Sequence, residues 1–144
     1  LHSFPTRRSS DLYGCDVAAW RGIAFEETCL THVSQVKRAL NIGGVESVES
    51  AYVVKGDDQK DGMQIDLLIE RADDVVNLCE MKFCRSPFAV TKQYARILAE
   101  RVEAMEHSYP SLTFHLTYIG SSPLAQNEYS DLFVSTVTLD DLFA

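Results

Sequence analysis

The stretch NLCEMKF, residues 77–83, decides the fold of this chain. Its four large apolar residues are typical of a buried β-strand: Leu78, Cys79, Met81 and Phe83. Glu80 and Lys82 interrupt them, although ionised side chains are rarely buried without an opposite charge or a metal. Side chains two apart on a strand point to the same face, so Glu80 and Lys82 point the same way. The pair therefore indicates either a half-exposed strand or a functional site.

The segment before this strand predicts a β-hairpin. In MQIDLLIERADDVVNLCEMKF, residues 63–83, two apolar runs flank a polar turn at residues 71–74. A three-residue loop there would place Asp66 directly opposite Glu80, with Cβ atoms roughly 5 Å apart. A two-residue loop would place them on opposite faces. Carboxylates that close repel each other unless a cation or a proton lies between them, so the three-residue loop predicts a cation site.

The rest of the chain predicts an α/β fold. The expected elements are helices at 18–40, 89–105 and 125–132, and strands at 47–55, 113–119 and 133–139. Together with the hairpin, this order predicts a mixed β-sheet flanked by helices. No apolar run approaches 18 residues, so we expect no membrane span. The four cysteines form no CxxC pair, which favours reduced thiols and a cytoplasmic protein.

Two polar side chains lie beside the apolar faces of the predicted helices. Six residues are expected to face inward from residues 18–40: Ile23, Cys29, Leu30, Val33, Val36 and Leu40. Glu26 lies about 35° from the centre of that face, so it either forms a salt bridge with Lys82 or joins a metal site. Gln93 borders the apolar face of the second helix. It is either an accessory site residue or a boundary residue that hydrogen-bonds to water.

The charges of the chain are segregated. The formal net charge of −8 argues against DNA binding by the whole surface. Residues 57–80 are rich in acids, whereas five basic residues fall between 82 and 101: Lys82, Arg85, Lys92, Arg96 and Arg101. This pattern suits a metal site beside a phosphate-binding edge, with Arg85, Lys92 and Arg96 as nucleic-acid contacts. The alternative is two solvated faces of opposite sign.

Asp66, the Glu80-Met81-Lys82 run and a preceding helix that carries Glu26 together resemble the PD-(D/E)XK nuclease superfamily, although Ile65 replaces the proline before Asp66. The longer pattern over residues 18–143 resembles the C-terminal nuclease-like domain of bacterial AAA-type ATPases. The resemblance implies a restriction-endonuclease-like sheet and metal-dependent DNA cleavage. It also implies four catalytic residues, of which the three acids would hold Mg²⁺ or Mn²⁺: Glu26, Asp66, Glu80 and Lys82. An upstream P-loop module in cis would bind ATP.

The start of the chain shows a second, separate resemblance. HSFPTRRSSDL, residues 2–12, is similar to the translation of a sequencing adapter. We therefore expect residues 1–12 to be an artefact and residues 13–144 to be one nuclease-like domain cut from a longer ATPase. Two alternatives stay open. The domain is a catalytically inactive nuclease fold that binds DNA or protein and regulates the ATPase, or the charged residues are a structural ion network.

Overall fold

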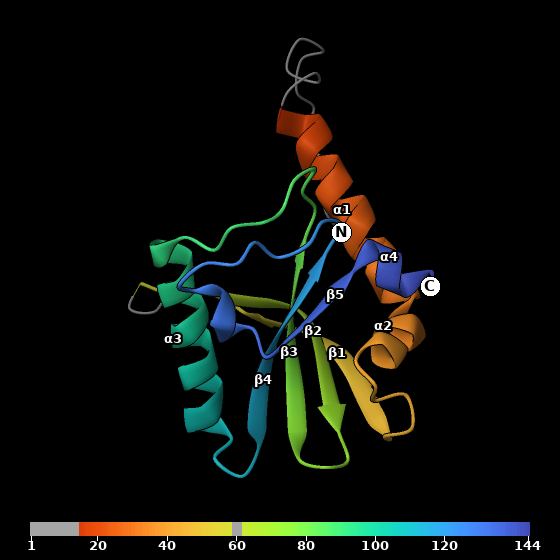
Figure 1. The fold of residues 1–144 in the computed structure, drawn as a ribbon. Helices are drawn as coiled ribbons and strands as arrows, with labels where there is room; N and C mark the ends of the chain where they lie inside the picture. The colour runs from red at the N-terminus through yellow and green to blue at the C-terminus, as the bar shows by residue number, and fades with distance from the viewer. Residues whose placement is uncertain (1–14, 59–61) are drawn as a thin grey trace, which may run out of the picture.

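The chain folds around a five-stranded sheet in the order β1-β2-β3-β4-β5 (Figure 1). The structure, a computed structural model, describes residues 15–58 and 62–144, so the expected artefact at residues 1–12 lies outside the described residues. The strands are β1 Ser47–Val54, β2 Met63–Arg71, β3 Val75–Lys82, β4 Thr113–Gly120 and β5 Ser135–Thr138. The helices are α1 Cys15–Thr31, α2 Val33–Ala39, α3 Lys92–Ser108 and α4 Leu139–Leu142, with a 3₁₀ turn at Ser130–Leu132.

The sheet is mixed, as expected. Strands β1, β2 and β3 pair antiparallel, and β3, β4 and β5 pair parallel. Helix α3 lies against one face of the sheet, while α1, α2 and α4 lie on the other (Figure 1). The prediction of an α/β fold with a mixed sheet flanked by helices is therefore confirmed.

The hairpin between β2 and β3 has the three-residue loop. Asp74 adopts a left-handed conformation, with φ 62°, and its N–H donates to the Arg71 carbonyl at 3.2 Å. A residue in this conformation commonly closes three-residue hairpin loops. Leu67 consequently pairs with Cys79, which is the predicted register.

Strand β3 is the centre of the core. Its residues 76–81 are all buried, because helices cover both faces of the sheet. One buried cluster includes Leu78 and Leu98 and lies beneath α3. The other includes Cys79 and Phe25 and lies beneath α1 and α2. The question raised by residues 77–83 is thus answered in part, since Glu80 is buried along with its apolar neighbours.

The single helix expected at 18–40 is wrong, since two helices meet at His32. His32 leaves the helical conformation, with φ −116° and ψ 31°. The buried residues of the two helices nevertheless belong to one hydrophobic cluster, which includes Phe25, Cys29 and Val36. Ile23 and Leu30 are 56% and 45% exposed, whereas Phe25 and Cys29 fill the buried face of α1.

Other boundaries shift by a few residues. Helix α3 begins at Lys92 rather than 89, because the Thr91 side chain accepts a hydrogen bond from the Tyr94 N–H and caps it. The helix expected at 125–132 is only the 3₁₀ turn, and the last strand stops at Thr138, where α4 begins. None of the helices in the described residues is long and apolar enough to cross a bilayer.

Candidate functional site

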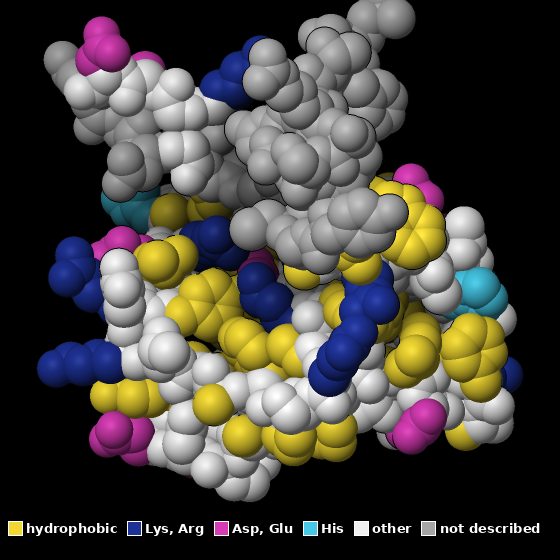
Figure 2. All heavy atoms as spheres, turned by 90° about the horizontal axis from the view of Figure 1, so that it is seen from above, with side chains coloured by type: hydrophobic (Ala, Val, Ile, Leu, Met, Phe, Trp, Pro, Cys, Tyr) yellow, Lys and Arg dark blue, Asp and Glu magenta, His cyan; other side chains and the backbone are white. Residues whose placement is uncertain are grey.

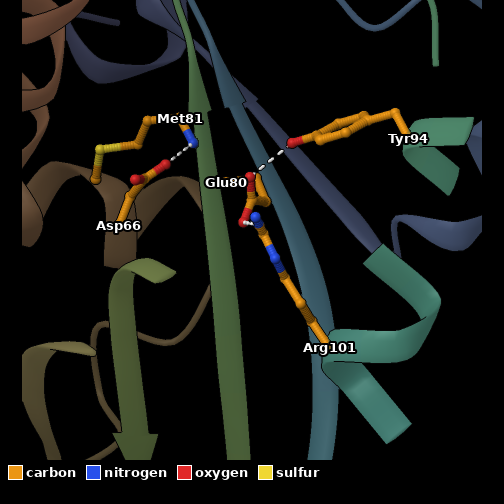
Figure 3. A network of polar contacts seen from close by, with 5 residues as sticks. All are labelled: Asp66, Glu80, Met81, Tyr94 and Arg101. Atoms are coloured by element: carbon orange, nitrogen blue, oxygen red, sulfur yellow. Dashed lines mark hydrogen bonds and ion pairs between the residues drawn. The ribbon is translucent and has the colours of Figure 1, made fainter. Parts of the chain in front are cut away.

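Glu80 is the most enclosed of the predicted site residues, at 4% exposed. Its Oε1 accepts a hydrogen bond from the Arg101 guanidinium at 2.6 Å, and its Oε2 accepts one from the Tyr94 hydroxyl at 2.6 Å. Figure 3 shows both partners reaching Glu80 from helix α3. Burial raises the pKa of Glu80, an effect that the Tyr94 hydrogen bond and the Arg101 charge partly offset. The ion-pair partner of Glu80 is thus Arg101, which the sequence interpretation had assigned to a basic edge.

Tyr94 and Arg101 are the site residues that the sequence interpretation missed. They are seven residues apart on α3, which places them on the same side of the helix at 100° per residue. The sequence did contain a signal for them. Arg101 lies on the same side of the helix as the inward-facing Tyr94, and an arginine in that position needs a buried acid as its partner.

Asp66 lies at a β-bulge. Ser50 pairs with Leu68 and Tyr52 pairs with Ile65, so two residues of β2 stand opposite a single residue of β1. Ile65 and Leu68 both pack under α3, although they are three residues apart, so the regular alternation of side chains is interrupted between them. The Asp66 Oδ2 accepts a hydrogen bond from the backbone N–H of Met81 at 2.9 Å.

The direct pairing of Asp66 with Glu80 is therefore not formed, even though the hairpin register is as predicted. Figure 3 shows Asp66 on one side of β3 and Glu80 on the other, directed towards α3. The bulge is the physical reason, because it turns the Asp66 side chain away from the position that regular alternation would give it.

Glu26 lies half-buried on α1, close enough to the other site residues to be affected by their charges. Burial raises its pKa most, the Asp66 charge raises it further, Lys82 lowers it and Glu80 raises it. The pKa of the buried Cys29 thiol, one turn along α1, is raised to about 12 by burial and then by Glu26 and Asp66. Glu26 on α1 and Asp66 on β2 are thus close enough for their charges to affect each other. The next residue, Glu27, is exposed.

Lys82 is close enough to Glu26 and to Glu80 for its charge to affect both. Its amine stands 4.9 Å from the centre of the Tyr94 ring, a cation–π contact. Its charge lowers the pKa of both Glu26 and Glu80. The four predicted catalytic residues therefore share one electrostatic neighbourhood, at the end of the sheet where the pairing of β2 with β3 stops.

Carboxylate oxygens are the ligands that Mg²⁺ prefers, so the donor types of this neighbourhood fit that ion. Their placement fits it only in part. Within residues 15–58 and 62–144, no three acidic, histidine or cysteine side chains stand close enough together to hold a metal ion. Both oxygens of Glu80 accept hydrogen bonds from α3, and one oxygen of Asp66 accepts a bond from Met81.

The remaining predicted residues surround this neighbourhood at the surface. Gln93, Lys92 and Arg96 are exposed on the first turns of α3, and Arg85 is exposed in the preceding loop. Gln93 points into solvent, and it is the adjacent Tyr94 that reaches Glu80. Arg96 pairs with Glu100 one turn along the helix. Figure 2 shows several Lys and Arg side chains on the face seen from above, around an area that is largely hydrophobic.

Comparisons with known proteins bear on the fold alone. No family model matches the chain, and no curated protein matches it. A solved structure titled as a protein of unknown function, AF1548, is similar, with a TM-score of 0.51 and 17% identity. The match covers 77% of this chain and 63% of that one, so the chain spans less than two thirds of its length. At this identity the likeness extends to the arrangement of helices and strands.

Proposed function

We propose that this domain is a metal-dependent phosphodiesterase that cleaves DNA. One observation carries the proposal: Glu26, Asp66 and Glu80 share a single electrostatic neighbourhood with Lys82. Three carboxylates stand there against the two cationic side chains of Lys82 and Arg101. Burial, and to a smaller extent the repulsion between the carboxylates, raises the pKa of Glu26 and of Glu80, so both carboxylates favour the protonated form.

The chain's own residues take distinct roles in this proposal. Asp66, Glu80 and Glu26 would hold Mg²⁺ or Mn²⁺ through their oxygens. When bound, the ion would polarise a phosphate oxygen and lower the pKa of a water molecule. Lys82 would stabilise negative charge that develops on the phosphate, because its amine extends from the same face as Glu80.

Binding of the DNA backbone would fall to the exposed basic residues at the same end of the molecule. Arg85, Lys92 and Arg96 are exposed and would contact phosphates, and the exposed pair of Arg96 with Glu100 is weak enough to give way. Such contacts would position the strand without reading its sequence. The buried free thiols of Cys29 and Cys79 suit a reducing cytoplasm. There, a P-loop ATPase module in cis would bind ATP.

A plasmid-nicking assay with Mg²⁺, with Mn²⁺ and with EDTA tests the proposal. Asp66→Asn is the informative variant, because asparagine keeps an acceptor for the Met81 N–H and removes the charge. We expect nicking by the wild-type chain with metal, and a loss of at least about 100-fold in Asp66→Asn. Glu70→Gln is the matched control, since Glu70 is an exposed acid of the same strand. Nicking that EDTA leaves unchanged, or that survives in Asp66→Asn, would refute the assignment.

The observed contacts of Glu80 favour a second candidate, a nuclease-fold domain without catalytic activity. Its carboxylate is already neutralised by Arg101, and this suits a domain that binds DNA or protein and regulates an attached ATPase. A wild-type chain that binds DNA equally well with Mg²⁺ and with EDTA, and that nicks in neither, would establish this candidate.

A further inference from the structure

We propose that the ring of Phe83 stacks on an unpaired nucleobase, so that the DNA which this domain binds is single-stranded or locally opened. The inference rests on the proposed use of DNA as substrate, and it names the form of that substrate. In a duplex each base is already stacked between its neighbours, so an aromatic side chain can stack only on a base that has left the helix.

Phe83 differs from the rest of the apolar run to which it belongs. Leu78, Cys79 and Met81 are at most 4% exposed, whereas Phe83 is 39% exposed. Its ring contacts that of Phe25, with centroids 6.1 Å apart and planes inclined at 56°. Because Phe25 is buried, the core supports the Phe83 ring, while the exposed part of that ring is accessible to a ligand.

The backbone on both sides of Phe83 is held in place. Strands β3 and β4 run parallel and end side by side, where Lys82 pairs with Gly120. The Ser121 N–H donates to the Lys82 carbonyl at 3.1 Å. The Ser121 hydroxyl accepts from the Cys84 N–H and donates to the Cys84 carbonyl, at 2.7 Å in each case. A ring that is already fixed loses little conformational freedom when a base binds, and the carboxyl ends of parallel strands are common ligand sites in open α/β sheets.

The charges near Phe83 suit the backbone of a nucleic acid strand. The basic residues at this end of the molecule are half-buried or exposed, and they lie on both sides of Phe83 in the sequence: Lys82, Arg85, Lys92 and Arg96. Glu80 does not oppose them, because Arg101 neutralises it. Proteins bind single strands by combining a positively charged surface along the phosphates with aromatic rings that stack on bases. The exposed ring among these cations therefore favours a single strand as its ligand.

The test is DNA binding measured by fluorescence anisotropy in EDTA, where metal-dependent cleavage cannot consume the probes. The probes are a labelled single strand of about 15 nucleotides and the blunt duplex of the same sequence. We expect wild type to bind the single strand about tenfold more tightly than the duplex. Phe83→Leu keeps an apolar side chain without a ring, so it should lose about tenfold in single-strand affinity and keep its duplex affinity. Phe83→Trp keeps a ring and should bind the single strand at least as tightly as wild type.

Two control variants separate stacking from charge and from exposure. Arg85→Gln should weaken binding to both probes and reduce its salt dependence, because phosphates are present in both. Phe143→Leu is the matched control, since Phe143 is 63% exposed at the end of α4 and its ring lies against His32. It should bind both probes as wild type does.

A folded Phe83→Leu variant that binds the single strand as tightly as wild type would overturn the inference. A wild-type chain that binds the single strand no more tightly than the duplex, or binds neither, would overturn it as well. If Phe83→Leu does not fold, the tryptophan emission that Phe83→Trp adds to that of wild type decides the question: quenching by the single strand supports stacking, and unchanged emission at saturation refutes it.

The nicking assay gives a separate result. A negatively supercoiled plasmid opens locally, so it remains a substrate under this inference. Preferential single-strand binding that Phe83→Leu loses, without any nicking by wild type in Mg²⁺ or Mn²⁺, would support the role of Phe83 and refute only the cleavage proposal.

Discussion

Replacing Tyr94 with phenylalanine should destabilise the protein by about 1.5–3 kcal/mol, the usual contribution of a hydrogen bond to a charged group. The change removes one hydroxyl, whose 2.6 Å hydrogen bond to Glu80 is lost. Water cannot replace it readily, because Glu80 is 4% exposed. The aromatic ring remains, and with it the edge contact with Phe88 and the position of the Lys82 amine. The loss of stability therefore reports the hydrogen bond rather than packing.

The stability that Tyr94→Phe loses should depend on pH, and the contacts of Glu80 determine the direction of that dependence. The pKa of Glu80 is raised in the folded protein, so the stability linked to its protonation is present below about pH 4.3 and is lost as pH rises through the raised pKa. The Tyr94 hydroxyl lowers that pKa, because it donates to the ionised form. In Tyr94→Phe, which lacks this hydroxyl, the pKa of Glu80 should rise further, so the loss of stability with rising pH should continue to higher pH. The Tyr94→Phe variant should thus fall furthest below wild type at neutral pH and approach it in acid.

Urea denaturation followed by circular dichroism between pH 4 and pH 8 measures both effects. A double-mutant cycle with Glu80→Gln isolates the pair, and Tyr109→Phe is the control, since Tyr109 is 45% exposed at the end of the same helix. A loss below about 0.5 kcal/mol at pH 7, which is typical of an uninvolved surface residue, would refute the reasoning. An equal loss in the Glu80→Gln background would refute it as well.

Two further predictions concern the packing of β4 and the charge on α1. Gly120→Ala should destabilise by about 1–3 kcal/mol in thermal unfolding, because a Cβ there would overlap the Tyr118 hydroxyl, which is buried and donates to the Ser122 carbonyl. A variant as stable as wild type would show that Tyr118 moves aside at little cost. Glu26→Gln should gain stability relative to wild type as pH rises from about 4.3 towards 7, because the folded pKa of Glu26 is raised and its charged form is disfavoured. Parallel pH profiles for the two proteins would contradict the raised pKa of Glu26.

Local features of the sequence determined most of the elements and the two possible registers of the hairpin. The polar turn before Val75 was compatible with a two-residue or a three-residue loop, and in the structure the left-handed Asp74 closes the three-residue loop, which pairs Leu67 with Cys79. The apolar run around Glu80 was sufficient to predict a strand, and the order of the elements predicted a sheet flanked by helices. Turn chemistry and hydrophobic periodicity act over a few residues, so they can be interpreted without knowledge of the rest of the chain.

Only the tertiary structure decided where the charged side chains point. The bulge at Asp66 depends on how β1 pairs with β2. The pairs on either side of it join residues 13 and 18 positions apart, and no local sequence pattern indicates it. The partner of Glu80 comes from α3, 21 residues along the chain, and it was chosen by the way that helix packs on the sheet. Strand alternation predicted a shared face for Asp66 and Glu80 because it assumes a regular strand. In the structure, the pairing of β1 with β2 and the packing of α3 on the sheet give Asp66 and Glu80 two separate sets of hydrogen bonds.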